Sequence, residues 1–146
     1  MNITSPAFNH NQQIPAKYTC DGEDVNPELI FGEVPAGAKS LVLIVDDPDA
    51  PAKTWVHWVV FNIKPEVKSV GENTVPQGWL EGVTDFGQEG WGGPCPPAGV
   101  HRYFFKLYAL DMELDLESGA TKAEVETTMA GHILAQAELV GVYERS

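Results

Sequence analysis

The chain has 146 residues, a formal net charge of −12 and 43% hydrophobic residues. A chain of this length buries a substantial core in one domain, so we expect a single domain over residues 1–146. The acidic charge repels nucleic-acid phosphates and anionic membrane surfaces, which excludes general binding to either. Any site for an anion must therefore be local and built from a few hydrogen-bond donors.

The cellular location and the state of the thiols are predicted from a few short segments. Residues 1–6 contain neither the basic region nor the apolar run of a signal peptide. The longest apolar run, Leu41–Val45, is too short to span a bilayer. We therefore expect a cytoplasmic protein without a transmembrane segment. Cys20 and Cys95 lie in turn-rich loops, and in a reducing cytoplasm we expect both to be free thiols.

The first two thirds of the chain predict strands separated by long loops. Residues 1–37 are broken by four prolines and predict short strands and loops. Ser40–Val45 is a run typical of a buried strand, and Trp55–Ile63 predicts a second strand with two apolar faces. Residues 64–99 show little regular pattern, and loops of this length in compact domains are usually functional.

The last third predicts one more strong strand, a helix and a short final strand. In the strand Tyr103–Leu110, alternation puts Tyr103 on the same face as His101 if the strand begins that early. A capping box at residues 121–124 opens a helix. The predicted apolar face of this helix comprises Val125, Met129 and Ile133, and its predicted end lies near Gly141. Residues 139–143 predict a short final strand. The fold class is therefore mainly β, a two-sheet sandwich with the helix packed outside.

Two segments join turn-rich loops to predicted strands, and each has a histidine near the junction. Residues 46–51 lead to His57, and residues 90–100 lead to His101. Loops held by a rigid scaffold commonly carry binding chemistry, so we expect the two histidines to meet at one pocket. Asp47 or Asp49 could orient either ring and favour its protonated form, which donates to an anion. The alternative is that each ring is a packed strand histidine.

The other candidate groups also have structural alternatives. Adjacent glycines such as Gly92 and Gly93 let backbone N–H groups turn toward an anion, although a rigid turn has the same composition. Tyr103 offers a hydroxyl, Trp55 is a candidate wall, and Arg102 is assigned to a structural ion pair. A metal site would need the two histidines with Asp47, Asp49 or Cys95, but no metal-type spacing supports it.

The sequence resembles the phosphatidylethanolamine-binding protein family, in its bacterial and archaeal Raf kinase inhibitor-like branch. The resemblance rests on DDPDAP at 46–51, WVHWVV at 55–60, GGPCPP at 92–97 and HRY at 101–103, with weaker matches at 18–22 and 131–135. It implies a Greek-key β-sandwich with one or two peripheral helices and a pocket for phosphate, acetate or a phosphorylated head group. The pocket residues that it implies are Asp47, Asp49, Trp55, His57, Gly93, Pro94, His101 and Tyr103.

These observations predict a binding protein for a small anionic or phosphoryl ligand, with a rigid pocket and no cofactor. The resemblance adds a regulatory role as an inhibitor of a kinase or protease, a protein target, and a homodimer. The alternative is a small hydrolase or lyase that uses the same histidines and aspartates for acid–base chemistry. For the binding protein we expect an affinity optimum near about pH 6 to 7, from the reference pKa values of histidine and phosphate.

Overall fold

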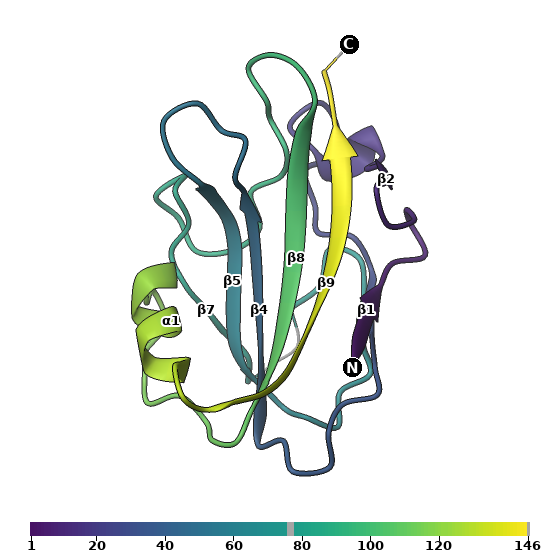
Figure 1. The fold of residues 1–146 in the computed structure, drawn as a ribbon. Helices are drawn as coiled ribbons and strands as arrows, with labels where there is room; N and C mark the ends of the chain where they lie inside the picture. The colour runs from purple at the N-terminus through teal and green to yellow at the C-terminus, as the bar shows by residue number, and fades with distance from the viewer. Residues whose placement is uncertain (76–77, 146) are drawn as a thin grey trace.

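A computed structural model describes residues 1–75 and 78–145 as two β-sheets with one α-helix outside them (Figure 1). The larger sheet has six strands, in spatial order β2 (Gln12–Gln13), β9 (Ile133–Tyr143), β8 (His101–Leu110), β4 (Ser40–Asp47), β5 (Trp55–Ile63) and β7 (Leu80–Glu81). The smaller sheet has the order β1 (Asn2–Thr4), β3 (Leu29–Gly32) and β6 (Ser69–Val70). A 3-10 turn, η1, spans Ala16–Tyr18.

The connectivity of the larger sheet brings distant segments together. β8 returns to pair with β4 in antiparallel register, although β5 to β7 lie between them in sequence. β9 then pairs along the other edge of β8, and β2 adds to β9 in parallel. This arrangement places the ends of β4, β5 and β8 side by side, and these are the ends that carry the predicted site residues.

The two faces of the larger sheet are both covered along its central strands. Between the sheets, buried apolar side chains such as Trp58 and Phe105 pack against residues of the smaller sheet such as Phe31. On the outer face, α1 (Lys122–Met129) contributes Val125 and Met129 to a second buried cluster over β4 and β5. Cover on both faces explains why these two strands are almost continuously apolar. The predicted mainly β sandwich with a helix outside it is therefore confirmed.

The predicted capping box opens α1, but the helix is shorter than expected. The Thr121 side chain accepts from the Glu124 N–H, and the Glu124 carboxylate accepts from the Thr121 N–H. The predicted extension through Ile133 toward Gly141 is wrong, because the helix ends at Met129 and Ile133–Tyr143 is a strand. Gly131, with φ +83°, reverses the chain between them. Antiparallel pairing with β8 then satisfies backbone groups along β9 and overrides the helical spacing.

Strand boundaries at the site differ slightly from the prediction. β5 has the predicted bounds, whereas β4 extends to Asp47 and β8 begins at His101. Residues 64–99 contain only the short strands β6 and β7 among irregular turns, and residues 76–77 of that segment lie outside the described part. None of the helices in the described part is long and apolar enough to cross a membrane.

Candidate functional site

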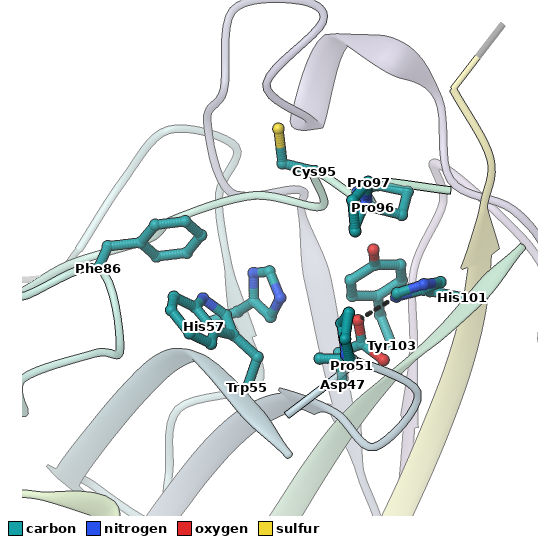
Figure 2. Close-up of a pocket in the computed structure, with 11 residues that line it drawn as sticks. Asp47, Pro51, Trp55, His57, Phe86, Cys95, Pro96, Pro97, His101 and Tyr103 are labelled. Atoms are coloured by element: carbon teal, nitrogen blue, oxygen red, sulfur yellow. Dashed lines mark hydrogen bonds and ion pairs between the residues drawn. The ribbon is translucent and has the colours of Figure 1, made fainter. Parts of the chain in front are cut away.

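A cavity of about 310 Å³ lies at the ends of β4, β5 and β8 (Figure 2). It brings together segments that are far apart in sequence, since β4 and β5 meet there with the loops that precede β8. The predicted site residues that line it are Asp47, Trp55, His57, His101 and Tyr103. The remaining lining residues are Ala50, Pro51, Phe86, Cys95, Pro96 and Pro97.

His101 and Asp47 form a buried pair on one side of the cavity. The Asp47 Oδ2 atom lies 2.7 Å from His101 Nδ1, and both side chains are less than a tenth exposed. A carboxylate oxygen accepts hydrogen bonds, so Nδ1 carries the proton and Nε2 is the ring nitrogen left for a ligand. Asp47 is itself held, because its Oδ1 accepts from the Asp49 N–H at 2.7 Å. Asp47 therefore orients the imidazole of His101.

His57 is held in one orientation across the cavity. Its Nδ1 lies 2.6 Å from the Gly92 carbonyl oxygen, which can only accept, so this nitrogen also carries a proton. The ring meets Phe86 and Tyr103 edge-on, at centroid distances of 5.4 Å and 5.2 Å. Burial lowers the pKa of His57 below its usual value, and the Gly92 hydrogen bond and the charge of Asp47 offset this only in part. The ring is therefore neutral at pH 7.

Tyr103 places a hydroxyl between the two histidines in Figure 2, directed toward Pro96. The side chain is 1% exposed, and its hydroxyl makes no hydrogen bond within the described residues. Burial, and next the negative charge of Asp47, raise the pKa of Tyr103 well above its usual value. The group is thus a phenol that is able to donate at any ordinary pH, and buried hydroxyls without a partner are uncommon in folded proteins.

Asp49 lies outside the cavity lining, and its predicted role as an orienter of an imidazole is wrong. Its carboxylate accepts from Arg102 Nε at 2.9 Å and from Arg102 Nη2 at 2.8 Å, and it also accepts from the Arg102 backbone N–H. These hydrogen bonds lower the pKa of Asp49 to about 2. Arg102 therefore has the structural ion pair that we assigned to it. Asp49 pairs with Arg102 and not with an imidazole because side chains alternate along a strand, which directs Arg102 away from His101 and toward the β4–β5 loop.

The glycine loop also differs from its predicted role as an anion cradle. The Gly92 N–H donates to the His57 carbonyl, and the Gly93 N–H donates to Asp24 Oδ1 at 2.8 Å. A Cβ at Gly93 would lie 2.3 Å from the Tyr18 carbonyl oxygen, so glycine is required there for close packing. Pro94 is likewise not among the residues that line the cavity, and its carbonyl accepts from the Cys20 N–H. Among the N–H groups of residues 92–97, that of Cys95 has no hydrogen bond to any residue that the structure describes.

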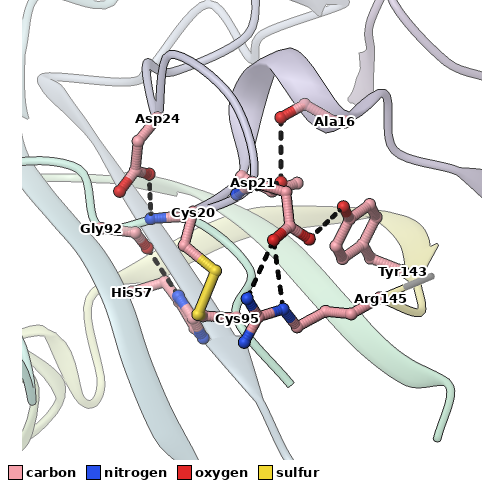
Figure 3. The surroundings of a disulfide bond; sticks show 11 residues. Ala16, Cys20, Asp21, Asp24, His57, Gly92, Cys95, Tyr143 and Arg145 are labelled. Carbon is pink, nitrogen blue, oxygen red and sulfur yellow. Dashed lines mark hydrogen bonds and ion pairs between the residues drawn. A yellow bond between two sulfur atoms is a disulfide. The ribbon is translucent and has the colours of Figure 1, made fainter. Parts of the chain in front are cut away.

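Cys20 and Cys95 form a disulfide, so the predicted free thiols are wrong (Figure 3). The fold brings their Cα atoms to 5.4 Å, although 75 positions separate them in sequence. Nearby, Asp21 accepts from the Tyr143 hydroxyl at 2.6 Å and from Arg145 Nε at 3.1 Å, which anchors the same segment to the end of β9. The bridge thus fixes the wall of the cavity that Cys95, Pro96 and Pro97 provide.

Most of the apolar wall of the cavity was not predicted from the sequence. Phe86 is 43% exposed, and it packs edge-on against Trp55 at a centroid distance of 5.6 Å. No periodic signal placed Phe86, because it lies in an irregular segment whose path depends on tertiary contacts. Pro51, Pro96 and Pro97 belong to the motifs that we recognised, but their composition indicated only stiff turns. The cavity therefore has an apolar mouth around a polar base.

A metal site has no support from the arrangement of the side chains. In the described ranges 1–75 and 78–145, no three His, Cys, Asp or Glu side chains cluster closely enough to hold a metal ion. Cys95 is bonded to Cys20, and Asp49 is paired with Arg102. Two of the donors considered for a metal are thus committed elsewhere.

Comparisons with known proteins agree with this fold over nearly the whole chain. The family model described as phosphatidylethanolamine-binding protein matches residues 4–144. A UPF0098 protein of Methanothermobacter thermautotrophicus is 53% identical over 99% of both chains. A solved phosphatidylethanolamine-binding protein homologue from Chlamydia trachomatis is 44% identical, with a TM-score of 0.96, over 99% of this chain and 97% of its own. The solved structure of Escherichia coli YbcL is 33% identical, with a TM-score of 0.93, over 99% of this chain and 98% of its own. The chain belongs to the phosphatidylethanolamine-binding protein family.

Proposed function

We propose that this protein binds a small ligand through an anionic, phosphoryl-type head group and releases it unchanged. The observation that carries the proposal is the Tyr103 hydroxyl, which is buried at the cavity without a partner in the described residues. Buried polar groups in native proteins normally have a hydrogen-bond partner, so a ligand oxygen is the natural acceptor for this phenol. The Nε2 atoms of His57 and His101 are the other polar groups that remain for the same ligand.

The size and lining of the cavity support a head group rather than a whole lipid. A volume of about 310 Å³ is at the lower end of the range for small-molecule pockets. Apolar side chains such as Trp55, Phe86 and Pro51 surround the polar base. They suit the short carbon chain of a phosphate monoester and exclude water from its charged end.

Binding without turnover is the simpler function for these groups. Cys95 is bonded to Cys20 and is no nucleophile in that state. The pKa of Tyr103 is raised, so this phenol is also a poor nucleophile. A hydrolase or lyase would have to rely on the histidines and a water molecule. Release of phosphate from generic phosphate monoesters, lost in His101→Ala, would favour the enzyme and count against our proposal.

Inhibition of a kinase or protease, a protein target and a homodimer stay predictions that rest on the family. The cytoplasmic location also stays a prediction, and the disulfide weighs against it, because disulfides persist mainly in oxidising compartments. A protein partner would present its phosphoryl or carboxylate group to the same cavity. A pull-down that free phosphate competes would support such a partner.

We expect Tyr103→Phe to weaken the binding of inorganic phosphate by about tenfold, the usual cost of losing one hydrogen bond to a charged group. The double variant His57→Ala, His101→Ala should abolish measurable binding. Isothermal titration calorimetry at pH 6.5 measures both. Tyr108→Phe, on the outer face of β8, is the matched control and should bind like the parent protein. Unchanged affinity in Tyr103→Phe and in the double variant would exclude this cavity as the site.

A further inference from the structure

The two histidines present different chemistry to a ligand in the cavity. Both use Nδ1–H inside the protein, His101 toward the Asp47 carboxylate and His57 toward the Gly92 carbonyl. The partner of His101 is a buried carboxylate, which places a negative charge behind that ring and suits the side of the cavity where a ligand oxygen accepts. The partner of His57 is a neutral carbonyl oxygen. A neutral His57 with Nδ1 protonated has a lone pair at Nε2, and there it accepts a hydrogen bond.

The orientation of His57 is fixed by packing, so ligand binding cannot exchange its two ring nitrogens at low cost. The side chain is 3% exposed and lies edge-on to the rings of Phe86 and Tyr103. Rotation would break the 2.6 Å hydrogen bond to Gly92, whose N–H is in turn bonded to the His57 carbonyl. These reciprocal bonds hold the segment around Gly92 against β5. The acceptor at Nε2 is therefore a built-in property of the site.

We propose that His57 is a specificity-determining acceptor, which selects an oxyanion that still carries a proton. Such a ligand donates its P–O–H to His57 Nε2 while its other oxygens accept from Tyr103 and His101. The inference rests on the proposed anion pocket and specifies the class of ligand within it. Singly protonated phosphate and phosphate monoesters have both kinds of group. Sulfate has the same tetrahedral shape but no proton at neutral pH, so its oxygen would face the His57 lone pair.

The pH dependence follows from the groups that act on His57. Asp47 and Asp46 of β4 and Asp24 of the loop after η1 favour its protonation, whereas burial among aromatic rings opposes it and dominates. Tyr103 of β8, across the ring, stays a neutral phenol. His57 is thus an acceptor near pH 7 and becomes a donor only in acid. Phosphate monoesters lose their second proton near about pH 6, so their binding should weaken as pH rises above that value.

Calorimetric titration of the oxidised protein with inorganic phosphate and with sodium sulfate tests this inference. At pH 6.5 we expect phosphate to bind at least about tenfold more tightly than sulfate, the cost of facing an unpaired buried acceptor. The ratio should fall only at a pH low enough to protonate His57, because a protonated ring donates to sulfate as well. His57→Gln presents an amide that can donate or accept, so this variant should lose most of the discrimination at pH 6.5.

His101→Gln is the matched variant, and it should weaken both anions while it keeps their ratio. Thermal unfolding of each variant shows whether the fold is retained. Equal affinities for phosphate and sulfate at pH 6.5 in the parent protein would overturn the inference and leave the proposed function standing. If neither anion binds, the proposed function fails and the inference fails with it. If folded His57→Gln keeps the parent protein's ratio of phosphate to sulfate affinity at pH 6.5, the inference is also overturned, because the discrimination would then come from another group.

Discussion

Removing the Cys20–Cys95 disulfide is expected to lower the free energy of unfolding by about 4 kcal/mol. The bridge joins residues 75 positions apart, and the entropy lost by the unfolded chain on closing a loop of that length corresponds to this value. Native disulfides in small domains commonly contribute 2–5 kcal/mol. Urea denaturation of the Cys20→Ser, Cys95→Ser variant beside the parent protein measures the difference.

The same variant should also bind phosphate more weakly, because Cys95 and its neighbours Pro96 and Pro97 form one wall of the cavity. Asp21→Asn is a suitable control. It removes the charge that pairs with Arg145 in the segment next to Cys20 but leaves the covalent bridge in place. Because solvent screens that exposed pair, its loss should lower the stability far less than loss of the bridge. A Cys20→Ser, Cys95→Ser variant as stable as the parent would show that noncovalent contacts alone hold the loop.

The second large effect is expected at Asp46, which lies on the opposite face of β4 from Asp47. Asp46 is 0% exposed, and its Oδ2 accepts from Lys122 at 2.7 Å and from Lys106 at 3.1 Å. Its Oδ1 has no hydrogen-bond partner in the described residues. Replacing both lysines with methionine would leave a buried carboxylate without compensation. We expect this change to cost about 3–5 kcal/mol in the free energy of unfolding at pH 7, measured by urea denaturation.

A third substitution separates charge from packing at this position. Adding Asp46→Leu to the Lys106→Met, Lys122→Met variant removes the stranded carboxylate, so most of the lost stability should return. Lys53→Met breaks a more exposed pair with Asp85, and as the surface comparison it should cost less than about 1 kcal/mol. If the Lys106→Met, Lys122→Met variant loses no more stability than Lys53→Met, the two lysines are not needed to compensate the buried carboxylate of Asp46.

The sequence predicted well those features that depend on local pattern. Alternation identified the strand Trp55–Ile63 with the bounds that the structure has, and the spacing of Thr121 and Glu124 identified the start of α1. The strand that begins at His101 places its imidazole and the Tyr103 ring on one face, as alternation requires. Periodicity misled only where pairing with β8 turned Ile133–Tyr143 into a strand.

The features that the sequence did not determine depend on contacts between distant segments. Asp47 ends β4 and Asp49 lies two positions later in the following turn, and only the β4–β8 pairing decides which one reaches His101. The sequence predicts Gly93 as part of an anion cradle. In the structure Gly93 packs against Tyr18 and donates to Asp24, which lies 69 positions earlier in the chain. The disulfide and the Phe86 wall depend in the same way on loop paths that no local pattern encodes.

The cavity occupies only one end of the central strands, and this has a practical consequence. In Figure 1 the loop between β4 and β5 and the loop that leads into β8 lie at the upper end, whereas the turn before β4 lies at the lower end. An eight-residue strand such as β4 is roughly 23 Å long. Coupling a sensor chip or a dye to the exposed Ala36, replaced by cysteine, would therefore leave the mouth open to the bulk solution. Anion exchange could then be followed on immobilised molecules in real time.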